Sequence, residues 1–188
     1  MGKITVETCE IEGLKIITPT VFGDERGYFM ETYNYNDFKE AGIDRAFVQD
    51  NQSSSKKGVL RGLHFQKEFA QDKLVRVVSG EVFDVAVDLR EGSATYGKWH
   101  GVRLSAENKK QFFIPKNFAH GFLVLSDTAE FAYKCTDFYH PNDEGGLAWN
   151  DPDIGVEWPI EEGMELTISD KDTKWGGIKE YTKNKNQG

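Results

Sequence analysis

Short runs of β-type residues separated by turn signals recur between residues 59 and 138, and this spacing limits what the chain can fold into. Turn signals such as Ser79-Gly80, Glu91-Gly92 and Ser126-Asp127 stand between the runs. Regularly spaced short strands are typical of an antiparallel β-sandwich or barrel. The sequence lacks the alternation of strands and helices that would predict a parallel sheet. The predicted strands are 59–66, 74–79, 81–89, 99–104, 111–114, 121–126 and 130–138.

The two ends of the chain are predicted to add short elements to this β-rich core. The residue pattern predicts strands at 4–6, 14–17, 28–33 and 46–51, a polar loop at 53–58, and a helix at 36–41 that begins at Asn36 and stops at Gly42. Ser169 and Asp172 fit a capping box, so a helical tail is predicted from about 169 to 188. Residues 1–188 are predicted to form one all-β domain with a few short helices.

Composition and charge restrict the partners of such a domain. Of the 188 residues, 38% are hydrophobic, which suits a folded domain with a sizeable core. The net charge of −8 disfavours binding to nucleic acids and to anionic membranes. No run resembles a signal peptide or a membrane span, and Cys9 and Cys135 predict no disulfide framework, so a cytoplasmic location is expected.

An arginine and a histidine lie three residues apart in the otherwise apolar or glycine stretch 58–65. If Arg61 is buried there, an anion is expected to meet it, because an unpaired buried charge is costly. Histidine is the side-chain type best suited to act as a base near neutral pH. Strict alternation places Arg61 and His64 on opposite faces, and they share a pocket only if Gly62 marks a bulge or twist. A half-exposed strand with a polar edge is the alternative interpretation.

Polar residues on otherwise apolar strand faces are the other candidates. By alternation, Lys73, His120 and Tyr133 each lie on the same face as apolar neighbours, and Asp84 between small apolar residues suits a pocket wall. Each of the three also has an interpretation without a functional role. Lys73 could be a lysine at a strand edge, His120 a histidine at the start of a strand, and Tyr133 a tyrosine in the core. For Asp172, helix capping is the better interpretation from sequence alone.

The histidines do not predict a metal site. The chain has four, at positions 64, 100, 120 and 140, and no two are separated by one to four residues. Metal-binding β-barrels commonly use two or three histidines with a carboxylate, so we expect no metal, and a metal-dependent barrel enzyme stays as an alternative.

Eight blocks that occur in order resemble the dTDP-4-dehydrorhamnose 3,5-epimerase family, from about residue 14 to residue 172. No single block is specific, but the ordered set is. The blocks are Asp24-Glu-Arg26-Gly-Tyr-Phe-Met-Glu31, Gln49-Asp-Asn51, Arg61-Gly-Leu-His64, Lys73-Leu-Val-Arg76, Gly80-Glu-Val-Phe-Asp84, Pro115-Lys-Asn-Phe-Ala-His120-Gly-Phe, Tyr133-Lys and Ser169-Asp-Lys171-Asp172.

The resemblance implies a cupin-type jelly roll, a pocket without metal or cofactor, and a homodimer to which residues 1–50 contribute. It implies epimerisation at C3 and C5 of dTDP-4-dehydro-6-deoxy-D-glucose to dTDP-4-dehydro-L-rhamnose. His64 would be the base, paired with Asp172, Tyr133 the acid, and Lys73 a neighbour of the C4 keto oxygen. Tyr139 would stack on thymine. The residues implied to contact nucleotide, diphosphate or sugar are Arg26, Glu31, Gln49, Asn51, Arg61, His120, Glu144 and Lys171, of which Arg26 and Glu31 would reach the neighbouring subunit's site.

This chemistry is physically consistent. A C4 ketone acidifies the C–H bonds on both sides, so one base can serve both carbons, and inversion needs a proton donor on the opposite face. We expect Lys73 to lower the pKa of Tyr133 for that purpose. The alternatives are an epimerase acting at C3 only or C5 only, a metal-dependent cupin, and a non-catalytic sugar-nucleotide-binding module.

Overall fold

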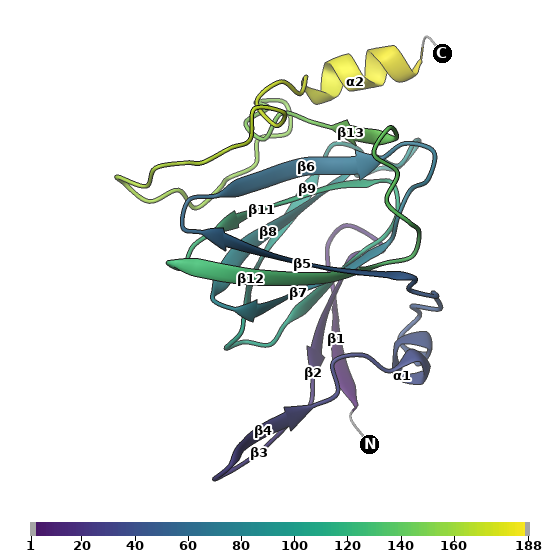
Figure 1. Cartoon of the computed structure of the whole chain (residues 1–188). Helices are drawn as coiled ribbons and strands as arrows, with labels where there is room; N and C mark the ends of the chain where they lie inside the picture. Colours follow the sequence, from purple (N-terminus) through teal and green to yellow (C-terminus); the bar gives the residue numbers. More distant parts are fainter. Residues whose placement is uncertain (1–2, 187–188) are drawn as a thin grey trace.

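Two antiparallel β-sheets form the sandwich in the computed structural model of the protein, which describes residues 3–186 (Figure 1). One sheet has six strands in the order β1-β2-β10-β7-β12-β5, and the other has five in the order β13-β6-β11-β8-β9. The predicted all-β sandwich with few short helices is confirmed. Residues 1–2 of the predicted domain and 187–188 of the predicted tail lie outside the described part.

The strands follow one another with mostly short connections, and a long segment joins β13 to helix α2. The six-stranded sheet contains β1 (Ile4–Thr8), β2 (Lys15–Pro19), β5 (Gln49–Lys56), β7 (Lys73–Ser79), β10 (Gln111–Ile114) and β12 (Thr128–Cys135). The five-stranded sheet contains β6 (Leu60–Gln66), β8 (Glu81–Asp88), β9 (Trp99–Ser105), β11 (Phe118–Val124) and β13 (Glu144–Gly146). The other elements are the hairpin of β3 (Val21–Asp24) and β4 (Gly27–Met30), helix α1 (Tyr35–Glu40) and helix α2 (Ile178–Lys185).

Strand alternation divides the core into three clusters. In β8, Val82 and Ala86 pack between the two sheets, whereas Val85 and Val87 belong to a second cluster on the opposite face, with residues of the C-terminal segment. A third cluster joins α1 to the six-stranded sheet through Phe38. Alternation predicted this division within β8 correctly. The space between the sheets is where the polar candidates of β7, β11 and β12 meet.

The predicted start of the first helix and the predicted loop at 53–58 were both wrong. Helix α1 is capped by Asn34, whose side chain accepts hydrogen bonds from the backbone N–H groups of Asn36 and Asp37, so the helix begins before Asn36. The predicted loop at 53–58 is largely strand, because β5 extends to Lys56 and pairs with β12 along its whole length. Backbone pairing with a long neighbouring strand outweighs the weak β propensity of the serines.

The C-terminal tail also differs from its prediction. Backbone N–H groups of Asp172 and Thr173 both donate to the Ser169 carbonyl, which makes one turn and not a helix. Helix α2 begins later, at Ile178, whose N–H donates to the Asp151 carboxylate at 2.6 Å. A cap supplied by a residue so distant in sequence leaves no local signal. Within residues 3–186, no helix is long and apolar enough to cross a lipid bilayer.

Candidate active site

A cavity of about 620 Å³ lies between the two sheets. It is lined from the six-stranded sheet by residues of β5, β7 and β12, from the five-stranded sheet by residues of β6 and β11, and by the segment 167–172. Eight of the predicted site residues line it together: Asn51, Arg61, His64, Lys73, His120, Tyr133, Lys171 and Asp172. Side chains that are far apart in sequence therefore line one cavity.

A one-residue bulge in β6 brings Arg61 and His64 to the same face. In the pairing of β6 with β11, His64 lies opposite His120 and Arg61 lies opposite Phe122, so three steps on β6 match two steps on β11. Arg61 and His64 are three residues apart, so in a regular strand their side chains would point to opposite faces. The extra residue of the bulge reverses the alternation once and returns both side chains to the same face. The bulge that the sequence required at Gly62 is present.

Glycine is needed at this bulge because Gly62 has a φ of +120° and touches β11. A Cβ at Gly62 would lie 2.6 Å from Gly121 Cα and 2.7 Å from the His120 carbonyl oxygen. We expect Gly62→Ala to lower the free energy of unfolding by about 2–4 kcal/mol, measured by urea denaturation. The matched control is Gly92→Ala, where φ is +73° but no atom lies within 4 Å of the new Cβ, and a loss of about 1 kcal/mol is expected. Equal losses in the two variants would contradict the role of the contact with β11.

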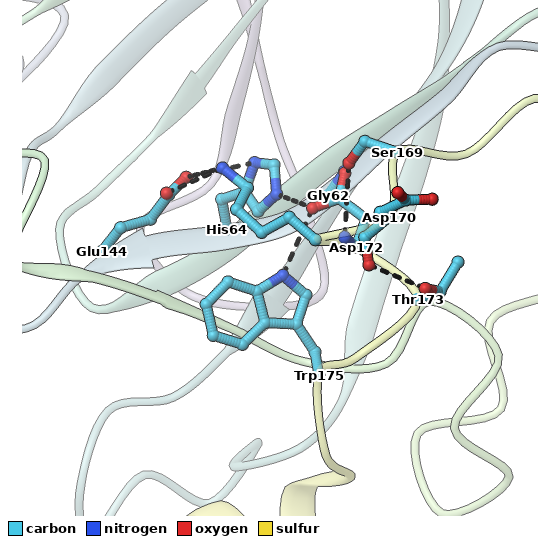
Figure 2. Close-up of polar contacts among 9 residues, drawn as sticks. Gly62, His64, Glu144, Ser169, Asp170, Asp172, Thr173 and Trp175 are labelled. Carbon is cyan, nitrogen blue, oxygen red and sulfur yellow. Dashed lines mark hydrogen bonds and ion pairs between the residues drawn. The ribbon is translucent and has the colours of Figure 1, made fainter.

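His64 and Asp172 form a tight pair at one wall of the cavity (Figure 2). His64 Nε2 lies 2.6 Å from Asp172 Oδ1. An ionised carboxylate only accepts hydrogen bonds, so this geometry assigns the hydrogen to Nε2 and the free lone pair to Nδ1. Burial acts to raise the pKa of Asp172, but hydrogen bonds from His64, Gly62 and Trp175 hold it below its ordinary value. Asp172 is thus an anion at neutral pH that can stabilise a positive charge on the imidazole.

Glu144 and Lys171 lie beside this pair. Lys171 Nζ is 2.8 Å from Glu144 Oε2, and Glu144 Oε1 is 3.9 Å from His64 Nδ1. Glu144 comes from β13 and Lys171 from the turn that carries Asp172, so the ion pair links the edge of the five-stranded sheet to that turn. The hydrogen bond that Lys171 donates to Glu144 raises the pKa of Lys171.

Lys73 and Tyr133 reach the cavity from the six-stranded sheet. Burial lowers the pKa of Lys73, and the negative charges of Asp84 and Glu144 oppose this effect. The predicted lowering of the Tyr133 pKa was wrong, because burial raises it and Arg61 offsets the increase only in part. The buried phenolate loses its hydration, so Tyr133 keeps its proton at neutral pH. A side chain that holds its proton suits a proton donor.

Arg61 is exposed in this structure, so the burial that would have required an anionic partner does not occur. Its Nε and Nη2 donate to Ser55 Oγ at 3.2 and 3.1 Å. The bulge turns the side chain toward the cavity instead of the core. Because the hydroxyl of Ser55 carries no charge, the guanidinium keeps its positive charge available to a ligand in the cavity.

His120 is held by a carboxylate that does not itself line the cavity. The Asp84 side chain is 0% exposed, and His120 Nε2 lies 2.8 Å from its Oδ2 and 3.0 Å from its Oδ1. Burial raises the pKa of Asp84, while His120 and Lys73 act in the opposite direction. The sequence marked Asp84 as unusual for a core, but alternation could not identify its partner on another strand.

The other predicted contacts lie at the rim or away from the cavity. Gln49 Oε1 accepts the backbone N–H of Tyr139 at 3.0 Å, and Gln49 Nε2 donates to Asn51, so a rim segment is tied to a residue of the cavity wall. Arg26 lies on the β3–β4 hairpin, which projects from the sandwich, and Glu31 follows that hairpin (Figure 1). The Arg26 side chain is 84% exposed and pairs with Asp24. The structure does not bring Arg26 or Glu31 to this chain's own cavity.

Several residues around the site were missed by sequence reasoning. Thr167 completes the wall because its backbone pairs with Gly58 and Leu60, with N···O distances of 2.9 and 3.0 Å. This pairing also explains how the long acidic linker 160–168 delivers Asp172 to His64. Ser55 and Trp175 were missed as well. Thr167 and Trp175 lie about a hundred residues beyond the strands they serve, so no local pattern could have revealed them.

The fold and the site define a cupin-like β-sandwich protein whose inner cavity brings a histidine–aspartate pair, a lysine and a tyrosine together from two sheets. The family model described as dTDP-4-dehydrorhamnose 3,5-epimerase matches residues 8–180. The dTDP-4-dehydrorhamnose 3,5-epimerase of Methanothermobacter thermautotrophicus is 59% identical over 170 residues, which cover 90% of this chain and 92% of that protein. The chain belongs to the dTDP-4-dehydrorhamnose 3,5-epimerase family, a family of isomerases.

Solved structures agree with this assignment. The dTDP-6-deoxy-D-glucose-3,5-epimerase of Legionella pneumophila, in complex with dTDP-4-keto-L-rhamnose, matches with a TM-score of 0.90 and 52% identity, covering 94% of this chain and 93% of that one. A 3'-monoepimerase of Streptomyces bikiniensis, in complex with dTDP-quinovose, matches with a TM-score of 0.82 and 30% identity, covering 95% and 96%. The fold alone therefore does not separate double from single epimerisation.

Proposed function

We propose that the protein inverts C3 and C5 of dTDP-4-dehydro-6-deoxy-D-glucose to give dTDP-4-dehydro-L-rhamnose, a step of dTDP-L-rhamnose synthesis. The observation that carries the proposal is the placement of His64, paired with Asp172, on the five-stranded sheet and of Tyr133 on the six-stranded sheet, with all three lining one cavity. A base on one wall and a proton donor on the other match the two faces of a carbon that is inverted. Membership of the epimerase family supports the same reaction.

His64 begins each inversion in this proposal. Its Nδ1 lone pair takes the proton from C5 or C3, and the electrons of the C–H bond form an enolate whose negative charge develops on the C4 oxygen. Asp172 orients the ring through Nε2 and stabilises the imidazolium that forms. Lys73, in its protonated form, stabilises the enolate oxygen.

Tyr133 completes each inversion. Its hydroxyl delivers a proton to the opposite face of the same carbon, and the C4 carbonyl re-forms. The phenolate then regains a proton from solvent and the His64 imidazolium releases one to solvent, so both groups are ready for the next inversion. The raised pKa of Tyr133 makes the phenolate a strong base, so it recovers that proton readily. The protein supplies every group in this sequence of steps, so the proposal involves neither metal nor cofactor.

The remaining predicted residues are proposed to bind the dTDP moiety and the sugar. Arg61 and Lys171 are suited to the diphosphate, because both are cations at the cavity and Arg61 can present a fork of donors. Tyr139, 52% exposed at the rim, is suited to stack on thymine. Gln49, Asn51, His120 and Glu144 are proposed to contact nucleotide or sugar.

Deuterium exchange tests the proposal directly. The 4-keto sugar nucleotide is incubated with enzyme and a metal chelator in D₂O and followed by proton NMR, with a coupled reductase assay for the L-rhamno product. Deuterium at both C3 and C5 with product formation is expected. Exchange at one position only would assign the single-position activity known by name for the 3'-monoepimerase that shares this fold. Exchange that requires a transition metal, or no exchange, would overturn the proposal.

We further propose that residues 1–188 act as one domain in a cytoplasmic homodimer, with residues 1–50 contributing to the interface. The β3–β4 hairpin supports this, because Phe22 and Phe29 are 47% and 63% exposed there. Arg26 on the same hairpin, and Glu31 after it, could then reach the partner subunit's cavity.

The hairpin gives a testable expectation about assembly. Phe29→Asp should shift the protein toward monomer in analytical ultracentrifugation, because a buried carboxylate without a partner disfavours the interface. Ile160→Asp, which replaces an exposed apolar side chain outside residues 1–50, is the matched control and should sediment like the unchanged protein. A dimer of undiminished strength in Phe29→Asp would remove the hairpin from the interface.

A further inference from the structure

Two hydrogen-bond donors meet on the same oxygen of Asp172 (Figure 2). His64 Nε2 lies 2.6 Å from Oδ1, and the indole Nε1 of Trp175 donates to that oxygen at 3.3 Å. The other oxygen, Oδ2, accepts the backbone N–H of Gly62 at 3.3 Å. Trp175 does not line the substrate cavity, so its link to the site runs through Asp172.

The indole is held from several sides. Its ring packs on Gly146, where a Cβ would lie 2.3 Å from Trp175 Cε2. The next residue, Gly176, accepts the backbone N–H of Ala148 at 2.9 Å, which fastens the segment to the strand region after β13. Gly146 lies opposite His64 in the pairing of β13 with β6. The indole is thus fixed relative to both members of the His64–Asp172 pair.

We propose that Trp175 is a positioning residue for the base, holding the Asp172 carboxylate in its ionised form and in line with His64. The inference rests on the proposed epimerase function and adds a residue to that site. An indole N–H can only donate, whatever the pH, so it always favours the carboxylate over the neutral acid. Because it shares Oδ1 with the imidazole, it also weakens that oxygen's hold on the proton of His64.

Loss of the indole N–H should therefore make Asp172 more basic. The pKa of Asp172, which Trp175 helps to keep low, is expected to rise, and the His64–Asp172 pair would take up protons at higher pH. The other ionisable groups that face the pair are Glu144 from β13, Lys171 from the adjoining turn and His120 from β11. These groups are the same in the variant, so a change in the titration of Asp172 reports the loss of the indole N–H.

Kinetics of Trp175→Phe test the inference. We expect kcat to fall about ten-fold, as for loss of one hydrogen bond to a charged group, while KM stays unchanged and the acid limb of the pH–rate profile moves to higher pH. Trp158→Phe is the matched control, because its indole is also partly buried but donates to the Trp149 carbonyl at 2.8 Å. A Trp175→Phe profile like that of the unchanged enzyme, or a change in KM alone, would overturn the inference.

A second measurement does not depend on activity. In the free enzyme, ¹³C NMR should show the Asp172 carboxylate titrating at higher pH in Trp175→Phe than in Trp158→Phe. Gly146→Ala, which displaces the indole without removing it, should have the same effect if Trp175→Phe does not fold. A shifted titration in an enzyme without epimerase activity would refute the proposed function only, whereas an unshifted titration in an active enzyme would refute the role of Trp175 only.

Discussion

His64→Asn is expected to lower kcat by about 10²–10⁴-fold while binding of dTDP changes little. The variant keeps a polar side chain opposite Asp172 but has no lone pair of comparable basicity facing the cavity. Asparagine cannot take up the sugar proton, so both C3 and C5 lose their base at once. Deuterium exchange at both carbons should therefore fall together, and isothermal titration with dTDP should show that the nucleotide site is intact.

His100→Asn provides the matched control for this prediction. His100 lies on β9 and is partly buried, but it is not among the residues that line the cavity. Its replacement should leave kcat unchanged, so the same chemical change has a large effect only at position 64. Near-normal turnover in His64→Asn, with a folded protein, would remove His64 as the base and would direct attention to the neighbouring Asp84–His120 pair.

Tyr133→Phe is expected to separate the two halves of the reaction. Formation of the L-rhamno product should fall by about 10²-fold or more, whereas deuterium exchange at C3 and C5 should fall much less. The phenyl ring keeps the packing of Tyr133 against Phe131, whose ring centroid is 5.9 Å away, so the fold should be retained. His64 can still form the enolate, but no donor on the opposite wall completes the inversion.

The comparison of exchange with product formation decides the role of Tyr133. If both rates fall equally, Tyr133 does not act simply as the proton donor for inversion. Tyr139→Phe is the matched control, because it removes the same hydroxyl from a residue at the rim. Tyr139→Phe should leave the ratio of deuterium exchange to product formation unchanged, since stacking on thymine requires the ring and not the hydroxyl.

The sequence predicted the architecture because the pattern that specifies it is local. Alternation along β8 separates Val82 and Ala86 from Val85 and Val87, and the structure places these pairs on opposite faces. The same rule predicted that Lys73, His120 and Tyr133 lie on apolar faces, and all three line the cavity. Errors arose where a distant partner decides the outcome, as in β5, which becomes a strand because β12 pairs with it.

The roles of individual site residues depend on burial and on contacts between segments that are far apart in the sequence. The sequence offered capping as the better interpretation of Asp172, but the pairing of Thr167 with the start of β6 delivers Asp172 to His64. A lowered pKa was expected for Tyr133 from an assumed cationic neighbour, and burial produces the opposite shift. Burial and proximity across strands are properties of the packed molecule, which one-dimensional spacing does not contain.

By itself, the sequence determined an antiparallel sandwich with a set of polar side chains on its inner faces, because backbone geometry sends alternate residues to opposite sides. The sequence also places a glycine, Gly62, between Arg61 and His64, where a bulge is required for both side chains to reach the same face. Only the tertiary structure decided that the bulge forms against Gly121, that Asp172 and Trp175 arrive from the far end of the chain, and that Asp84 holds His120. These contacts join segments that are distant in sequence, and their geometry is set only when the two sheets and the C-terminal segment pack together.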